Sequence, residues 1–423
     1  MNSAVAAATG LSATMSFGIV FAVTLGVTAL TVPITMRIAR RVGAIAVPGD
    51  RRVHATPTPT LGGAAMYVGM LAGVGAASML GQFRAAFEAS GNVAAVVVAA
   101  TIIFGTGIID DVREVSAPAK LAGMVLAGSV LSLGGVTIFN LPLPFIGFTV
   151  LSPDLAALVT VVWVVTMANA VNIIDGLDGL AAGVMAIASG AFLLYSVKLD
   201  SAGALFAGNA GPLLAVVTLG VCVGFLPWNV HPARTFMGDT GALLLGLMMA
   251  SSTIAVGGQS DDSFTGQSWF FFAPLVIPLL ILGVPLIDMV FAILRRTTRR
   301  SGVATADKDH VHHRLMRLGH GHRRSVVILW AWTALLSVFA LYPAITGRST
   351  LMVPVALAAL ALLGFTIVTP WFDRRRERRS SRRRRGPIPG ASNPAGSPTG
   401  GSEGGSEEDR PSAAPPTQTR SAV

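Results

Sequence analysis

Charged residues are scarce in this chain. Only 12% of its 423 residues are Asp, Glu, Lys or Arg, whereas 52% are hydrophobic and the mean hydropathy is +0.66. A soluble protein of this length cannot bury so much apolar surface. The composition therefore excludes an ordinary soluble protein and predicts one that resides in the membrane.

Cysteine is nearly absent, because Cys222 is the only one and lies within an apolar run. This excludes an intrachain disulfide framework and a cysteine metal site. Lys and Arg are absent from residues 1–16, which argues against a cleaved signal peptide. The chain also lacks a repeat of fixed period and an inverted duplication, two features typical of transporters.

Uncharged apolar runs, by contrast, recur along the chain. About 20 residues cross the hydrocarbon core as a helix, so we predict an all-α polytopic integral membrane protein with about eleven transmembrane helices. The runs are 11–36, 61–83, 93–109, 121–139, 155–174, 179–197, 210–230, 240–258, 267–287, 325–347 and 349–372. We assign residues 1–372 to one membrane-spanning domain.

The basic residues set the orientation. With the N-terminus outside, 28 of the 31 Lys and Arg residues fall in inner loops or the tail, leaving Arg84, Lys198 and Arg348 outside. Positive charge is retained in the cytoplasm. We therefore predict a multi-pass protein of the cell membrane with its N-terminus outside and its C-terminus cytoplasmic.

Residues 373–423 have a different composition. The segment opens with RRRERRSSRRRR and continues in Gly, Ser, Pro and Glu with almost no aliphatic residues. Such a segment cannot bury enough surface to fold, so we predict a disordered cytoplasmic tail. Its Arg cluster either contacts anionic lipid headgroups or serves only as a topology anchor. It contains no aromatic residues, so no nucleic-acid partner is predicted.

Carboxylates and histidines gather in the inner loops. The first loop contains PGDRRVHATPTPTLGG with His54, and the second contains IIDDVREVSAPAK with Asp110, Asp111 and Lys120. The other three are NAVNIIDGLDGL (169–180), PWNVHPARTFMGDTG (227–241) and DKDHVHHRLMRLGHGHRR (307–324). The outer loops contain no comparable cluster. We expect a site at the inner face.

Each cluster also has a structural interpretation. Asp110 and Asp111 could mark the water boundary, but adjacent carboxylates repel unless a cation neutralises them. Asp178 and Asp239 could be N-caps, although capping leaves Asn172 and Asp175 unexplained. Oxygen ligands and glycines at helix starts instead suit a metal-bound diphosphate.

The fifth loop holds closely spaced histidines. His310, His312 and His313 with Arg314 could form a transition-metal site. Without cysteine, and beside many basic residues, we favour contact with phosphate. We expect His320 and His322 to be solvated surface. The residues alone thus predict a cytoplasmic, Mg²⁺-compatible, phosphate-binding site open to the bilayer.

Four motifs in order now carry a resemblance: DD at 110–111, NxxNxxDGLDGL at 169–180, FMGDTG at 236–241 and HVHHRL at 310–315. Over residues 17–370 the chain resembles the polyprenyl-phosphate N-acetylhexosamine-1-phosphate transferases, the superfamily of MraY and WecA. The stretch HATPTPTLGG has His54 and no Lys where MraY-type enzymes carry one, which resembles the WecA branch. An MraY-type activity on UDP-muramoyl-pentapeptide remains the alternative.

The resemblance implies transfer of GlcNAc-1-phosphate from UDP-GlcNAc to a polyprenyl phosphate, decaprenyl or undecaprenyl, with release of UMP, as the first step of a cell-envelope polysaccharide. It implies Mg²⁺, with Mn²⁺ as an alternative, held by Asn172 and Asp239. Catalytic roles fall to a group of acids and one lysine: Asp110, Asp111, Lys120, Asp175 and Asp178. Substrate contacts fall to His54, Gly176, Leu177, Asn229, Phe236, His310, His312, His313 and Arg314.

Two alternatives belong to other classes. An ion-coupled transporter would place its acids near mid-membrane, whereas these acids lie at the inner ends of the predicted spans. A metal-dependent membrane hydrolase would release free sugar phosphate without a lipid acceptor. The sequence leaves the oligomeric state open, with a homodimer among the options.

Overall fold

The computed structural model describes residues 12–47, 57–88, 92–113, 115–143, 147–258, 279, 282–284, 286–290, 315–316, 320–346 and 353–366. Within these ranges the chain is helical as predicted, apart from four short strands. The tail 373–423, and with it the predicted boundary at residue 372, lies outside the described residues.

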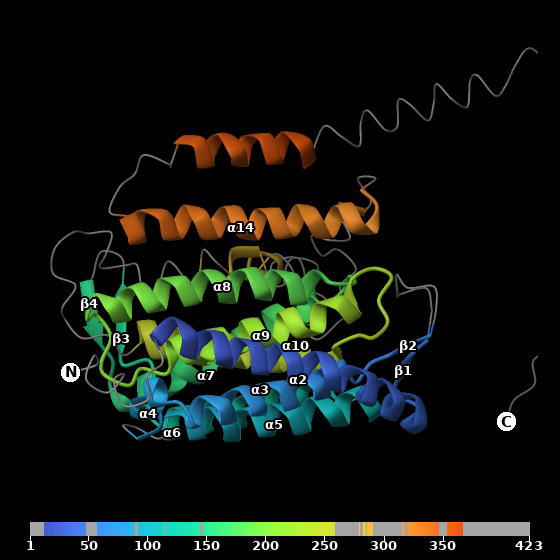
Figure 1. Ribbon diagram of the computed structural model, residues 1–423, viewed down its shortest axis with the longest axis horizontal. Coiled ribbons are helices and arrows are strands. Elements are labelled where there is room, and N and C mark those ends of the chain that lie inside the picture. The colour runs from blue at the N-terminus through green and yellow to red at the C-terminus, as the bar shows by residue number, and fades with distance from the viewer. Residues whose placement is uncertain are drawn as a thin grey trace, which may run out of the picture. The chain divides into compact units, whose positions relative to one another are not determined.

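Seven helices in the described part are long and apolar enough to cross a membrane, or eight if a bent pair counts as one span. They are α2 (Ala13–Val42), α5 (Asn92–Arg113), α7 (Pro153–Ile174), α8 (Leu180–Ser201), α9 (Gly211–Asn229), α10 (Gly238–Gly257) and α14 (His322–Thr346). The protein is therefore a polytopic membrane protein, and Figure 1 shows these helices as the main body of the described chain.

The predicted runs and the observed helices agree in position, with differences in detail. The bent pair, α3 (Gly62–Ser78) followed by η1 (Gly81–Phe83) and α4 (Arg84–Glu88), turns by 92° where one straight span was predicted. The helices α6 (Ala117–Leu133) and Val353–Thr366 occupy two further runs but are short. The run 267–287 lies largely outside the described residues, so the total of eleven stays a prediction.

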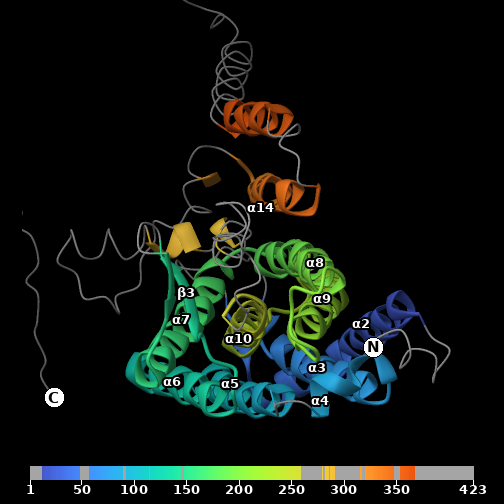
Figure 2. The same cartoon turned by 90° about the vertical axis from the view of Figure 1, so that its left-hand side faces the viewer.

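Helix α10 is the central element. It packs against α3, α5, α7 and α9, which Figure 2 shows around it. Of its apolar window 94% is buried, against 22% for α2. Its sequence GALLLGLMMASSTIAVG is small or apolar on every side, so no face needs water. A site residue at the start of α10 is consequently held by the most buried helix of the described part.

Helix α2 packs through threonines against glycines. Thr24 and Thr28 are fully buried, and they lie against Gly69 and Gly73 of α3 and against glycines of α9. Thr24 Oγ1 donates to Val20 O at 2.7 Å, so its hydroxyl is satisfied within its own helix. Small residues let helix backbones approach closely where lipid provides no hydrophobic driving force.

This packing predicts that Gly69→Ala destabilises the protein. The added Cβ would meet the hydroxyl of Thr28 and lie 3.2 Å from Thr24 O. We expect a loss of about 1–3 kcal/mol in the free energy of unfolding, because overpacking forces the backbones apart. The control is Gly75→Ala in the same helix, whose Cβ meets nothing within 4 Å. Thermal unfolding in detergent measures both, and equal midpoints would contradict the interface.

The strands form two small hairpins at the ends of helices. β1 (Ile45–Ala46) pairs antiparallel with β2 (Thr58–Pro59), and β3 (Asn140–Leu143) pairs antiparallel with β4 (Gly147–Val150). The first hairpin carries the start of α3 toward the beginning of α10. It therefore brings the first inner loop to the polar residues described next.

Candidate active site

The described parts of the inner loops with polar clusters meet at one end of the helices. Phe236 N–H donates to Pro59 O at 2.9 Å, and Gly62 N–H donates to Phe236 O at 3.0 Å, which joins the first inner loop to the fourth. Thr235 Oγ1 also donates to Pro59 O at 3.0 Å. These bonds satisfy buried backbone groups and fix the entry to α10.

Asp111, near the end of α5, caps the start of α10. Its Oδ1 accepts a hydrogen bond from Asp239 N–H at 2.8 Å, and its Oδ2 accepts from Thr240 N–H at 3.2 Å and Thr240 Oγ1 at 2.6 Å. A carboxylate here satisfies free N–H groups and faces the positive end of the helix dipole. Asp239 is not the N-cap of α10, since the helix begins one residue earlier at Gly238.

Lys120 joins a predicted catalytic acid, Asp110, to a predicted metal ligand, Asp239. Its Nζ lies 2.9 Å from Asp110 Oδ2 and also pairs with the carboxylate of Asp239. Asp110 Oδ1 accepts from Val115 N–H at 2.8 Å, which holds the turn between α5 and α6. The three side chains are only 14–23% exposed, so the ion pairs are shielded from solvent. The structure thus brings Asp110, Lys120 and Asp239 together.

The DGLDG turn connects α7 to α8. Asn172 lies half-buried in the last turn of α7, where its carbonyl accepts from Asp175 N–H at 3.3 Å. Gly176 is exposed and Leu177 is buried. Gly179 has a φ of +77°, a conformation that favours glycine and lets α8 begin directly afterwards. α7 packs along α10, but a shared ligand of Asn172 and Asp239 stays a prediction.

Asp175 is unfavourable as a charged group at this position. Burial, and after it the carboxylates of Asp239, Asp111 and Asp178, raise the pKa of Asp175 well above its usual range. These surroundings favour the protonated form of Asp175, and a bound cation would oppose that preference by favouring the carboxylate. The four acids therefore form one electrostatic group on three helix ends.

We expect Asp175→Asn to stabilise the metal-free protein at neutral pH. A folded-state pKa above the unfolded value means that the folded form binds the proton more tightly. Wild-type stability therefore falls as pH rises from about 4 toward the folded pKa. The variant lacks this loss, so its advantage should be absent near pH 4 and grow above it. Thermal unfolding with EDTA across this range provides the measurement, and a pH-independent difference would contradict it.

Asn229 holds the DGLDG turn against the fourth inner loop. It is 1% exposed; its Oδ1 accepts from Gly179 N–H at 3.0 Å, and its Nδ2 donates to Thr235 O at 3.0 Å. Phe236 is half-buried in the same loop. The side-chain oxygen and nitrogen of Asn229 thus both bond to backbone groups and hold the DGLDG turn in place. The predicted contact of Asn229 with substrate stays a prediction.

Asp178 meets two histidines that the predicted site did not include. Asp178 Oδ2 lies 2.7 Å from His231 Nδ1, 3.1 Å from the Ala233 N–H that donates to it, and 3.9 Å from His322 Nε2. The expectation of solvated surface for His320 and His322 is wrong. His320 is 2% exposed with its Nε2 at 2.8 Å from Thr366 O. In the sequence, the HPA triplet that contains His231 and the GHGHRR run that contains His322 were the available signs of these histidines. Only the fold shows that both lie beside the carboxylate of Asp178.

Several predicted contacts cannot be placed. His54, His310, His312, His313 and Arg314 all lie outside the described residues. Their roles therefore stay predictions.

The acidic group fits a hard divalent cation. Asp110, Asp111 and Asp239 each offer a carboxylate oxygen, and these oxygens lie within 4.8 Å of one another. An all-oxygen donor set is the one that Mg²⁺ prefers. Lys120 forms ion pairs with two of these carboxylates, those of Asp110 and Asp239. The cluster of three acids is thus already stabilised by one positive charge. The residues present are thus compatible with Mg²⁺.

This arrangement defines a class: a polytopic membrane protein with a carboxylate and lysine site where its helices end. The model of Glycosyl transferase family 4 matches residues 93–257, a range that includes α5, α7, α10 and their acids. Curated relatives match over a longer part of the chain.

A decaprenyl-phosphate N-acetylglucosaminephosphotransferase of Mycobacterium leprae (strain TN) is 39% identical over 80% of this chain and 86% of the relative. A probable undecaprenyl-phosphate N-acetylglucosaminyl 1-phosphate transferase of Bacillus subtilis (strain 168) is 34% identical over 76% of this chain and 84% of the relative. A phospho-N-acetylmuramoyl-pentapeptide-transferase of Mycolicibacterium smegmatis (strain ATCC 700084 / mc(2)155) is 31% identical over 66% of this chain and 81% of the relative. The chain belongs to the family of polyprenyl-phosphate N-acetylhexosamine-1-phosphate transferases, within glycosyl transferase family 4.

Proposed function

We propose that this protein transfers GlcNAc-1-phosphate from UDP-GlcNAc to a polyprenyl phosphate, forming polyprenyl-diphosphate-GlcNAc and UMP. The observation that carries the proposal is the pairing of Lys120 with Asp110 and Asp239 beside Asp111. Relatives that share most of the chain, and whose names state this transfer, support the choice of substrates. The higher identity to these relatives than to the muramoyl-pentapeptide enzyme favours UDP-GlcNAc.

The reaction joins two anions. An oxygen of the lipid phosphate attacks the phosphorus that carries the sugar, and the bond from that phosphorus to the oxygen of the uridylate breaks. Lys120 binds the lipid phosphate and offsets its charge, while Asp110 orients it or takes its proton. Asp175 contacts the nucleotide-sugar.

Asp239, Asn172 and the neighbouring acids would hold Mg²⁺. When bound, the ion neutralises charge on the diphosphate and on the leaving uridylate. Lys120, which pairs with Asp110 and Asp239, would remain the cation of this chain that binds the phosphate of the acceptor.

We further propose that the site faces the cytoplasm of a cell membrane and that the acceptor is decaprenyl phosphate. The predicted distribution of Lys and Arg supports the orientation. The mycobacterial relative supports the acceptor length. Both statements depend on the transfer itself and are tested after it.

The test uses purified full-length protein, Mg²⁺, labelled UDP-GlcNAc, and decaprenyl phosphate present or absent. We expect UMP and labelled lipid only when the acceptor is present. UMP with free sugar phosphate and no acceptor would indicate a hydrolase. Turnover with UDP-muramoyl-pentapeptide and none with UDP-GlcNAc would indicate the MraY-type activity. Movement of a solute into proteoliposomes without UMP would indicate a transporter.

A further inference from the structure

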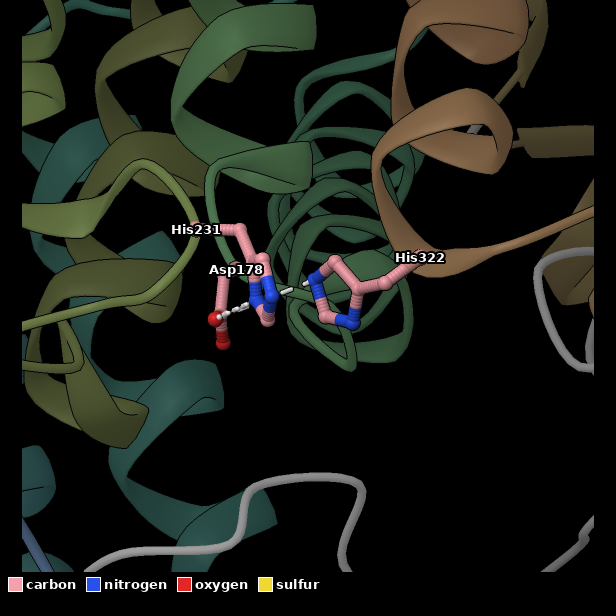
Figure 3. A group of neighbouring side chains, drawn as sticks. All are labelled: Asp178, His231 and His322. Carbon is pink, nitrogen blue, oxygen red and sulfur yellow. Dashed lines mark hydrogen bonds and ion pairs between the residues drawn. The ribbon is translucent and has the colours of Figure 1, made fainter.

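Asp178, His231 and His322 meet at a point where three separate segments converge, as Figure 3 shows. We propose that these three side chains form a binding site for Zn²⁺, separate in chemistry from the all-oxygen group of Asp110, Asp111 and Asp239. One ligand atom from each residue lies within 4.8 Å of the others.

The donor set selects the ion. Two imidazole nitrogens and one carboxylate suit Zn²⁺ and other borderline ions, whereas Mg²⁺ takes oxygen ligands. The rings of His231 and His322 stack with their centroids 4.4 Å apart, and Asp178 Oδ2 lies beside one nitrogen of each ring. Two nearby cation sites of different chemistry are therefore present in one described region.

The distances suit a tetrahedral ion. Ligand atoms about 2.1 Å from Zn²⁺ stand about 3.4 Å apart in that geometry. The Asp178 Oδ2 atom lies 2.7 Å from His231 Nδ1 and 3.9 Å from His322 Nε2, values on either side of that separation.

The Nε2 atom of His322 is the clearest sign of a missing partner. It is buried and has no hydrogen-bond partner among the described residues. A buried polar atom without a partner costs roughly 1–3 kcal/mol. Because the atom lies on the side of Asp178, an ion bound between them would satisfy it.

The surroundings hold the ligands in place. Ala233 N–H donates to Asp178 Oδ2 at 3.1 Å, and Arg323 Nη2 donates to His231 O at 3.2 Å. Hydrogen bonds of this kind fix the orientation of the side chains that would bind the ion. His231 has a side chain 39% exposed, against 9% for Asp178, so an ion can enter from the side of His231.

A bound ion would join α14 to the start of α8. His322 begins α14, whose Trp330 lies against Gly183 and donates to Leu180 O at 3.4 Å. Asp178 stands just before α8, and His231 follows α9. Zn²⁺ would therefore stabilise the packing of α14 on α8. An ion that binds only the folded form raises the thermal unfolding midpoint, and this shift can be measured.

The experiment titrates Zn²⁺ into purified full-length protein in detergent, with Mg²⁺ in excess, using a chromophoric chelator as competitor. We expect one Zn²⁺ per chain and a rise in the thermal unfolding midpoint. Co²⁺ should give the intense visible absorption of a four-coordinate site. His231→Gln and His322→Gln should each weaken binding by at least about 10-fold and abolish the midpoint shift. His320→Gln is the matched control, since its Nε2 contacts Thr366 O instead.

Binding retained in both histidine variants, or absent in the wild type, would overturn the site. So would binding lost equally in His320→Gln, in Asp239→Asn, or on joint substitution of His310, His312 and His313. Unfolding of each variant without Zn²⁺ separates loss of a ligand from loss of the fold. None of these readouts is transfer activity, so the inference stands or falls independently of the proposed function.

Discussion

Asp239→Asn is expected to abolish transfer while the protein stays folded and inserted. The substitution removes a charge that pairs with Lys120 and adjoins Asp110 and Asp111. The hydrogen bond that the backbone N–H of residue 239 donates to Asp111 is unchanged, so the start of α10 keeps its cap. We expect transfer to fall by at least about a thousandfold, equivalent to about 4 kcal/mol of transition-state stabilisation.

The matched control is Asp200→Asn. Asp200 lies in the last turn of α8, about 30 Å of helix away from the DGLDG turn. Its variant should transfer at close to the wild-type rate. The assay is UMP formation with Mg²⁺, UDP-GlcNAc and decaprenyl phosphate, with thermal unfolding measured in parallel. Wild-type turnover by Asp239→Asn would remove this residue from the site.

Asp110→Ala and Asp111→Ala are expected to share one effect and differ in another. Both should lower transfer by at least about 100-fold, the range for loss of a group that orients or moves a proton. Asp111→Ala should in addition lower the free energy of unfolding by about 1–2 kcal/mol. The reason is that Asp111 accepts three hydrogen bonds at the buried start of α10. Asp110 accepts one backbone hydrogen bond, from Val115 N–H, and when its ion pair with Lys120 is lost, Lys120 still pairs with Asp239.

Asp111→Asn separates the two roles. Its amide oxygen can still accept a hydrogen bond at the start of α10, so most of the stability should return while transfer stays low. Denaturation midpoints and initial rates of UMP formation, measured on the same preparations, provide the comparison. Equal stability of the two alanine variants would argue against the cap, and normal transfer by both would remove the pair from the site.

Carboxylates at the ends of helices distinguish this site from that of an ion-coupled transporter. Asp110 and Asp111 are near the end of α5, Asp239 is near the start of α10, and Asp175 and Asp178 lie between α7 and α8. None of these acids is near the middle of its helix, where a transporter would be expected to bind its ion. This placement accords with a substrate that arrives from water and an acceptor held in the bilayer.

The apolar runs predicted the helices because the bilayer requires backbone hydrogen bonds to be satisfied within each span. Even so, the run 61–83 did not reveal the 92° bend after α3, since hydropathy contains no information on direction. The burial of α10 was equally hidden. Its mean hydropathy of 1.6 is lower than the 2.1 of α2, although α2 is far less buried, so hydropathy does not predict which helix lies inside.

Among the polar residues, the motifs indicated Asp110, Lys120, Asp175 and Asp239 because charged groups are expensive beside lipid and must have a reason to be there. The motifs did not predict which of these residues form ion pairs. Lys120 and Asp239 are distant in sequence, and nothing in either motif specifies that they share an ion pair. The exposed character assigned to His322 was wrong for the same reason, since its neighbour Asp178 comes from another helix end.

The sequence by itself determined that the protein resides in a membrane, how many apolar runs it has, its predicted orientation and the chemical character of its inner loops. These follow from local properties: transfer free energy, charge, and the residue types that bind phosphate and metal. Only the tertiary structure decided that Asp111 caps α10, that Lys120 lies between two acids, and that Asp178 meets two histidines. Such contacts depend on how helices of similar composition pack, and composition alone does not specify their neighbours.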